Sequence, residues 1–254
     1  MRVSYDTEFG GSSTSASAGF RQQTLKNSIY CSGTGLHSGA KVAMSLHPAE
    51  PDTGILFRRS DIAGETANIP ARFDMVSDTR LCTTLSNEAG VSVSTVEHLM
   101  AALAGCGVDN AVVEINGPEL PIMDGSSEPF VFLIDCAGVV AQGAPRRAIR
   151  VLKPVSIEDG ASSARIEPWA GSSINIELDF ETKVIGRQSL FIDMLSDSFR
   201  ERLSRARTLH PSILGRFMSS VSAKGSSRSA SSTAASPSDT VTGVKPASRT
   251  WAEI

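Results

Sequence analysis

The chain of 254 residues lacks the features that mark several common classes of protein. It has no run of about 18 apolar residues, the length that a membrane-spanning helix needs. Its first residues contain no apolar stretch of the signal-peptide type. The formal net charge is only −3, which gives no electrostatic support for binding nucleic acid. We therefore expect no transmembrane segment and no nucleic-acid partner.

Cysteine and histidine are scarce as well, with four of each in the chain. No two cysteines have CxxC spacing, so a cysteine-rich zinc site is not expected. Free thiols are typical of reducing compartments, which predicts a cytoplasmic protein. The four cysteines are Cys31, Cys82, Cys106 and Cys136.

The apolar share of 41% is enough for a substantial core. Strand patterns followed by helix patterns occur in two successive blocks, which predicts the α+β class with two units. From 219 to 238, fifteen of twenty residues are Ser, Ala or Thr, and such a segment cannot bury enough apolar area to become ordered. The expected organisation is a flexible tail (1–19), a first α+β domain (20–143), a linker (142–145), a partial second α+β domain (146–208) and a low-complexity, disordered end (209–254).

Several elements can be assigned from periodicity and from turn residues. Alternation at 41–46 predicts a half-buried strand, and two short apolar runs around 87–90 predict a hairpin. Ser94 is a candidate N-cap for a helix that ends at Gly105 and Gly107. The remaining predictions are a strand at 108–115, a helix at 130–137, strands at 149–157, 164–167, 174–180 and 189–192, and a helix at 197–207.

The strongest chemical signal is Glu97 followed directly by His98 on the predicted helix. The histidine ring can bind zinc while the carboxylate takes a proton from a metal-bound water, a known route to hydrolysis at neutral pH. The alternative is a purely structural role. Glu97 would then belong to a capping box and bond back to the backbone N–H of Ser94, and His98 would be an ordinary hydrogen-bonded residue. His37 stands in a glycine-rich turn, and Asp124 is interpreted as the Asx residue of a rigid turn.

Taken together, these segments closely resemble the UDP-3-O-acyl-N-acetylglucosamine deacetylases, the zinc enzymes of bacterial lipid A synthesis. The resemblance implies two layered α/β-sandwich domains of similar topology, with zinc in the cleft between them. It implies that His98 is a zinc ligand, Glu97 the general base, Thr208 an oxyanion stabiliser, and Cys82 a residue beside the substrate channel. The implied reaction removes acetate from the UDP-linked acylated glucosamine. The stretches that carry the resemblance are GTGLHSG (33–39), the segment 78–83, STVEHLMAALAG (94–105), PIMDGS (121–126) and SRART (204–208).

The chain departs from the family pattern after Thr208. Leu209 stands where the family has phenylalanine. The later family segment supplies a His and, four residues on, an Asp as the other zinc ligands, and a further His as general acid for the leaving amine; none of these has a counterpart here. The one histidine after His98 is His210. We therefore expect an incomplete zinc site and a second domain that is incomplete. The hypothesis that explains this is a frameshift near Thr208 or a truncated paralogue, and the alternative function is a non-catalytic remnant that acts as a binding module or has no function.

Overall fold

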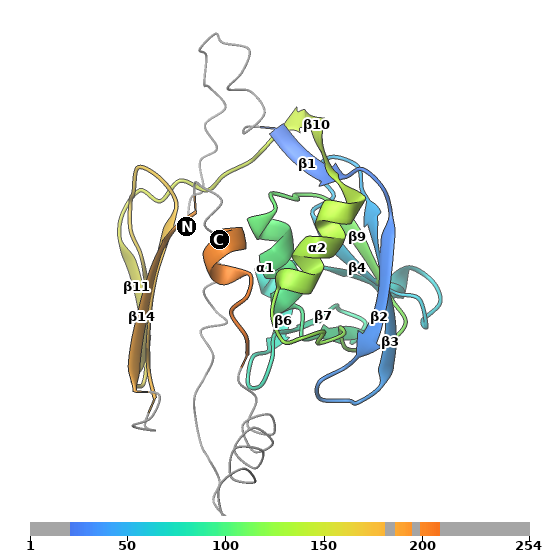
Figure 1. Cartoon of the computed structure of the whole chain (residues 1–254), viewed down its shortest axis with the longest axis horizontal. Helices are drawn as coiled ribbons and strands as arrows, with labels where there is room; N and C mark the ends of the chain where they lie inside the picture. Colours follow the sequence, from blue (N-terminus) through green and yellow to red (C-terminus); the bar gives the residue numbers. More distant parts are fainter. Residues whose placement is uncertain (1–20, 181–185, 195–198, 209–254) are drawn as a thin grey trace, which may run out of the picture.

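The structure is a computed structural model that describes residues 21–180, 186–194 and 199–208 (Figure 1). The predicted tail at 1–19 and the predicted disordered end at 209–254 lie outside the described residues. Across the part of the chain that is described, no helix has the length and apolar character needed to cross a membrane. The described chain mixes several sheets with few helices, which confirms the predicted α+β class.

The first part of the chain is built on a five-stranded sheet with the order β2-β3-β9-β4-β5. The alternation predicted at 41–46 is confirmed, because Val42, Met44 and Leu46 are buried and their neighbours are not. β9 is antiparallel to β3 and parallel to β4, so it lies at the centre of the sheet. These strands are β2 (Ile29–Thr34), β3 (Lys41–Pro48), β4 (Ile55–Arg59), β5 (Asn68–Pro70) and β9 (Ala111–Ile115).

A three-stranded sheet and two short 3-10 helices also belong to this part of the chain. The hairpin predicted around 87–90 is confirmed as β7 and β8, which pair antiparallel, while β6 lies on the other side of β7. These elements are β6 (Val76–Asp78), β7 (Thr84–Ser86), β8 (Ser92–Ser94), η2 (Glu65–Ala67) and η3 (Phe73–Met75).

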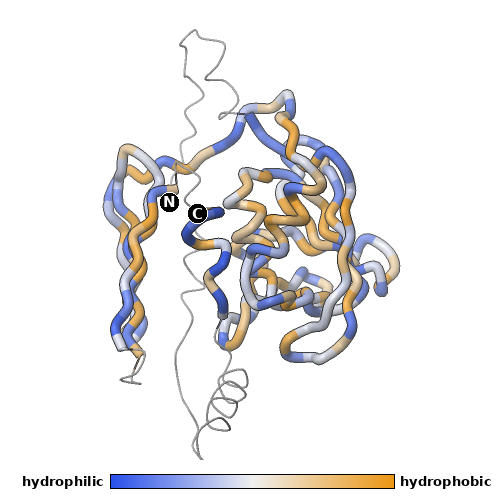
Figure 2. Tube along the Cα trace, in the orientation of Figure 1, coloured by the Kyte–Doolittle hydropathy of each residue, from blue (hydrophilic) through white to orange (hydrophobic). Residues whose placement is uncertain are grey.

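Two α-helices, α1 (Glu97–Gly105) and α2 (Glu128–Ala137), pack side by side and contribute to the same core as the five-stranded sheet (Figure 1). α2 has Pro129 in its first turn and ends at Gly138, which has φ 73°, so both ends have their favoured residues. Phe130 and Ile134 are almost fully buried, and each such side chain contributes about 1.5–3 kcal/mol. The tube of Figure 2 shows the apolar residues concentrated in these helices and in the sheet behind them.

β1 (Arg21–Leu25) and β10 (Val139–Pro145) form an antiparallel pair that joins the two ends of this part of the chain. The linker predicted at 142–145 is therefore wrong, because these residues are the last part of β10. Asn110 explains the pairing: its buried side chain donates to Gln22 on β1 at 2.8 Å and to Gln142 on β10 at 2.7 Å. A polar Gln-Gly-Ala-Pro segment thus finds its partners inside the fold and does not act as a spacer.

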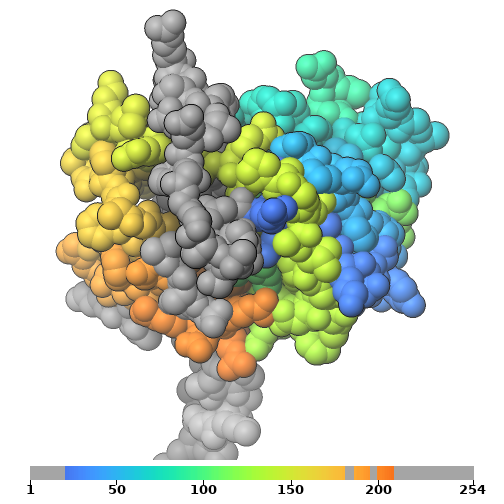
Figure 3. All heavy atoms as spheres, turned by 90° about the horizontal axis from the view of Figure 1, so that it is seen from above, coloured from blue at the N-terminus to red at the C-terminus, as the bar shows by residue number. Residues whose placement is uncertain are grey.

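The later strands form two separate hairpins, β11 with β12 and β13 with β14. They lie to one side of the first part of the chain, where their yellow and orange segments can be followed in Figures 1 and 3. The strand predicted at 149–157 begins only at residue 155, while the other three predicted strands are confirmed. The strands are β11 (Val155–Asp159), β12 (Ser162–Ile166), β13 (Ser173–Asp179) and β14 (Arg187–Asp193).

The helix predicted at 197–207 begins outside the described residues, and within 199–208 the structure shows one π-helical turn, η4 (Phe199–Leu203). Its continuation is prevented by tertiary contacts that take the backbone groups a helix would use. The Ser204 carbonyl accepts from the N–H of Ser127 at 3.0 Å, and the Thr208 N–H donates to the Gly125 carbonyl at 2.9 Å. Residues 204–208 therefore follow the surface of the first part of the chain.

Candidate active site

Glu97 is the first residue of α1, and its carboxylate is held by a loop that precedes β7. The Glu97 Oε2 atom accepts a hydrogen bond from the backbone N–H of Thr83 at 3.0 Å. A carboxylate in the first helical turn is also favoured by the positive end of the helix dipole. The capping-box interpretation is wrong, because Ser94 belongs to β8 and no side chain caps this helix.

Thr95 makes the sharp connection between β8 and α1. Its φ is 60°, in the left-handed region that β-branched residues rarely adopt. Such a conformation costs about 1–3 kcal/mol and persists only where the surroundings impose it. Here the Thr95 hydroxyl is buried and donates to Glu119 at 3.4 Å, while Ser94 bonds to the backbone on both sides, at Pro118 and Leu120. The strained turn brings Glu97 and His98 to the surface directly after a strand.

His98 follows Glu97 and faces Thr208, which is 110 residues further along the chain. The His98 Nε2 atom and the Thr208 Oγ1 atom are 3.2 Å apart. Burial lowers the pKa of His98, and the negative charges of Glu97 and Asp124 oppose this effect only in part. The ring is therefore kept neutral near pH 7, the form in which a histidine can accept a proton or bind a metal.

Asp124, whose charge also acts on His98, lies in a turn with the Asx hydrogen bonding that the sequence predicts. Its Oδ1 atom accepts from the N–H of Ser126 at 2.9 Å and from the Ser126 hydroxyl at 2.7 Å. Burial raises the pKa of Asp124, but the hydrogen bonds from Ser126 and the charge of Arg207 outweigh it, and the net shift is downward. Asp124 is thus an ionised residue whose charge acts on His98, a role that its interpretation as a turn residue did not include.

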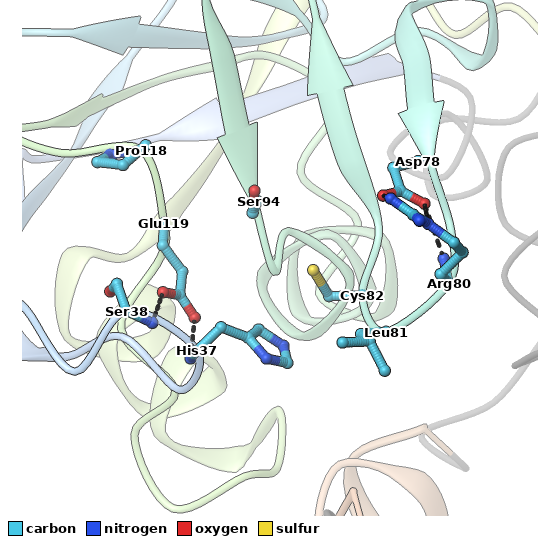
Figure 4. A pocket seen from close by; sticks show the side chains of 9 residues that line it. All are labelled: His37, Ser38, Asp78, Arg80, Leu81, Cys82, Ser94, Pro118 and Glu119. Carbon is cyan, nitrogen blue, oxygen red and sulfur yellow. Dashed lines mark hydrogen bonds and ion pairs between the residues drawn. The ribbon is translucent and has the colours of Figure 1, made fainter. Parts of the chain in front are cut away.

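Cys82 lies beside a surface hollow of about 740 Å³, immediately before the residue that holds Glu97. Figure 4 shows the ring of His37 directed across this hollow toward Cys82 and Leu81. The structure therefore places His37, which the sequence offered only as a member of a glycine-rich turn, on the same hollow as Cys82. The other lining residues are Ser38, Asp78, Arg80, Ser94, Pro118 and Glu119.

Glu119 holds the glycine-rich turn in place, and nothing in the sequence singled it out. Its carboxylate accepts from the backbone N–H groups of His37 and Ser38, both at 2.8 Å. Burial raises the pKa of Glu119, yet these N–H groups and the Ser38 hydroxyl stabilise the charge more strongly, so the net pKa is lowered. Gly35 permits this contact, because a Cβ atom there would lie 2.5 Å from the carboxylate.

The described residues do not form a complete metal site. They contain no group of three His, Cys, Asp or Glu side chains that could hold an ion, whereas a catalytic zinc is normally held by three protein ligands. His98 is a suitable single ligand. A full zinc site would need ligands from outside the described residues.

The start of α1 thus presents the Glu97 carboxylate and the His98 imidazole, and the Thr208 hydroxyl contacts the imidazole. Side chains of these three kinds serve as general base, metal ligand and hydrogen-bond donor in hydrolysis. The chain belongs to the UDP-3-O-acyl N-acetylglycosamine deacetylase (LpxC) family, whose model matches residues 22–235. This confirms the family resemblance that the sequence motifs indicated, and the match extends beyond Thr208.

Three relatives, each named UDP-3-O-acyl-N-acetylglucosamine deacetylase, illustrate the similarity. The protein from Photobacterium profundum is 47% identical over 190 residues, which cover 74% of this chain and 62% of the relative. The protein from Vibrio cholerae is 48% identical with the same coverage, and that from Shewanella frigidimarina is 44% identical over 74% of this chain and 61% of the relative. The chain thus spans about three fifths of the length of the curated relatives it matches.

Proposed function

We propose that this chain belongs to a deacetylase that removes acetate from UDP-3-O-acyl-N-acetylglucosamine in lipid A biosynthesis, and that it supplies the general base and a substrate-binding surface. The observation that carries the proposal is the contact of His98 with Thr208 at 3.2 Å, at a position where the negative charge of Glu97 also acts on His98. Family membership adds the substrate, because the relatives are named for it.

In this proposal the side chains divide the work of amide hydrolysis. Glu97, fixed by the N–H of Thr83, takes a proton from the attacking water. The Thr208 hydroxyl donates to the oxygen that becomes negative as the carbonyl is attacked, and one such donor typically accounts for about 3–4 kcal/mol. The water oxygen ends on acetate, and the amine leaves with the proton.

His98 is the residue that would bind zinc, and Cys82 would contact the substrate from the hollow it lines. The lowered pKa of His98 supports the first role, because a metal ligand must be unprotonated. With a single ligand among the described residues, zinc is assigned to this chain as a family property. The two-domain division at about 145 and a cytoplasmic location belong to the same proposal.

The roles of Glu97 and Thr208 can be tested in a chimeric protein that joins residues 21–208 to the remaining part of the Vibrio cholerae relative. Acetate release from UDP-3-O-acyl-N-acetylglucosamine is measured for the parent and for Glu97→Gln and Thr208→Val. We expect kcat to fall by about 10²–10⁴ for the first variant and about 10²–10³ for the second. Glu88→Gln, in the exposed β7–β8 turn, removes the same charge as Glu97→Gln and should be silent. An active Glu97→Gln chimera would remove the proposed base.

The 254-residue polypeptide itself gives a second test, through its zinc content. After incubation with excess zinc and desalting, metal analysis should find far less than one zinc per chain, because one histidine holds the ion weakly. Tight stoichiometric zinc that is lost on His98→Ala would show that residues outside the described part complete the site.

A second candidate function is binding without hydrolysis, for which the hollow beside Cys82 would be the binding surface. Calorimetry with the UDP-linked acyl sugar separates the two. Binding by a polypeptide that releases no acetate would support the binding function, and acetate release would exclude it.

A further inference from the structure

Residues 199–208 form a strap that starts with η4 beside the C-terminal ends of α1 and α2 and reaches the His98 site at the start of α1. In Figure 1 the strap is the orange segment that starts beside α1. Its last residue, Thr208, supplies the hydroxyl next to His98. The position of that hydroxyl therefore depends on what holds the strap.

The first anchor is Phe199, which is 3% exposed and belongs to the core. Its ring lies directly on Gly105, the last residue of α1, where an added Cβ atom would be 2.1 Å from a ring carbon. Gly105 does not have the positive φ that favours glycine, so its backbone conformation would accept other residues. The close approach of the Phe199 ring is therefore the feature that requires glycine here.

The second anchor is Arg200, which binds both helices. Its guanidinium donates to the Asp135 carboxylate of α2 at 2.6 Å and to the sulfur of Cys106, just after α1, at 3.2 Å. Ser204 is the third anchor. It is 2% exposed, its hydroxyl donates to the Arg200 carbonyl at 2.6 Å, and its own carbonyl accepts from Ser127 at 3.0 Å.

Beyond Ser204 the attachment is weaker. Arg205 forms an exposed ion pair with Glu128, and Thr208 donates its N–H to Gly125 at 2.9 Å. Together with the Thr208–His98 contact and a local bond from the Ala206 N–H to Leu203, these exposed contacts contribute little net free energy against the entropy of ordering the residues. The buried anchors at the start of the strap must supply the rest.

We propose that Gly105 and Phe199 are positioning residues for Thr208: the phenylalanine seated on the glycine holds the strap, and the strap places the Thr208 hydroxyl beside His98. Arg200 supports the same placement through Asp135. The catalytic importance of this placement rests on the function proposed above for Thr208. The positioning of the Thr208 hydroxyl by the strap is independent of that function.

The test compares amide hydrogen exchange in the full chain with that of Gly105→Ala. The added methyl displaces the Phe199 ring, and exchange at the N–H groups of Thr208 and Ser127 should become at least about tenfold faster. The nuclear Overhauser contact between the Thr208 methyl and the His98 ring should weaken in parallel. Adding Phe199→Leu makes room for the methyl and should restore part of the protection.

Two further variants keep the result interpretable. Phe57→Leu lowers stability from within the five-stranded sheet, away from the strap. It should leave the Thr208–His98 contact intact. If Gly105→Ala acted only by lowering overall stability, the two variants would affect this contact equally. If Gly105→Ala does not fold, Arg200→Gln acts on the same strap through a partly exposed side chain and should also speed exchange at Thr208.

Unchanged exchange and an unchanged Thr208–His98 contact in Gly105→Ala, or in Arg200→Gln where that variant replaces it, would overturn the positioning role. The proposed function fails in a different way. A chimera in which Thr208→Val retains full deacetylation would remove the catalytic meaning of Thr208 while leaving the strap geometry as measured.

Discussion

Replacing Glu119 by glutamine tests whether one buried carboxylate holds the glycine-rich turn that carries His37. The two carboxylate oxygens serve separate N–H groups, since Oε1 accepts from His37 and Oε2 from Ser38, both at 2.8 Å. Glutamine keeps the shape but has a single oxygen, so one of these N–H groups must face the amide NH₂ group.

The expected loss follows from that mismatch. Hydrogen bonds to a charged group contribute about 1.5–3 kcal/mol, and a buried donor left without a partner costs about 1–3 kcal/mol. Because His37 and Ser38 are exposed and their N–H groups can reach water after a small movement, we expect the lower half of this range, about 1–2 kcal/mol. The loss should be concentrated in the turn at 33–39.

Urea unfolding gives the total loss, and amide exchange at His37 and Ser38 gives its location. Glu88→Gln is the matched control, because it removes the same charge from an exposed loop. Equal stability of Glu119→Gln and Glu88→Gln, with unchanged exchange at His37, would refute the reasoning.

The same variant predicts a pH dependence. The pKa of Glu119 in the folded chain lies below its ordinary value of 4.5. Its carboxylate therefore stabilises the fold fully above pH 4.5, and the contribution is lost as the pH falls through the lowered pKa. The stability difference between wild type and Glu119→Gln should shrink over that acidic range and stay constant from pH 6 to pH 8, at about its neutral value.

Two further predictions concern groups away from the His98 site. Asn110→Asp should lower the free energy of unfolding by about 1–3 kcal/mol in urea titrations, because the side-chain oxygen of Gln142 loses its donor while that of Gln22 keeps the Asp52 N–H; a loss below about 1 kcal/mol would show that these amides reorganise freely. Burial raises the pKa of Cys106 to about 11, so iodoacetamide at pH 8 should label the exposed Cys136 well before Cys106, as peptide mass spectrometry can show. Equal labelling rates would contradict the closed packing around Cys106.

The elements that the sequence predicted correctly are those whose signal is local. Alternation identified β3, and a glycine-containing turn between two apolar runs identified the β7–β8 hairpin. The start of α1 was misplaced because a serine three residues before a glutamate resembles a cap. In the structure Ser94 is paired with Thr84 of β7, and the positive φ of Thr95, which no local preference predicts, separates this strand from the helix.

The contacts that the sequence could not predict join distant segments. Glu119 lies more than 80 residues from the turn it holds, and the residues at 142–145 looked like a spacer because their partners lie on β1. The motifs did nominate Glu97, His98, Cys82 and Thr208, and the structure brings His98 and Thr208 into contact. Their chemical roles stay predictions for the chimera to decide.

The pairing of β1 with β10 makes the two ends of residues 21–145 neighbours, with Arg21 opposite Pro145. A short linker could therefore join residue 145 to residue 21, and the chain could be opened at the exposed turn between β7 and β8 without breaking a strand. Such a circular permutant should keep the core contacts that residues 21–145 make among themselves and lack the contact of Phe199. The same adjacency means that the chain leaves this part of the fold, after Pro145, at the edge where Arg21 begins it.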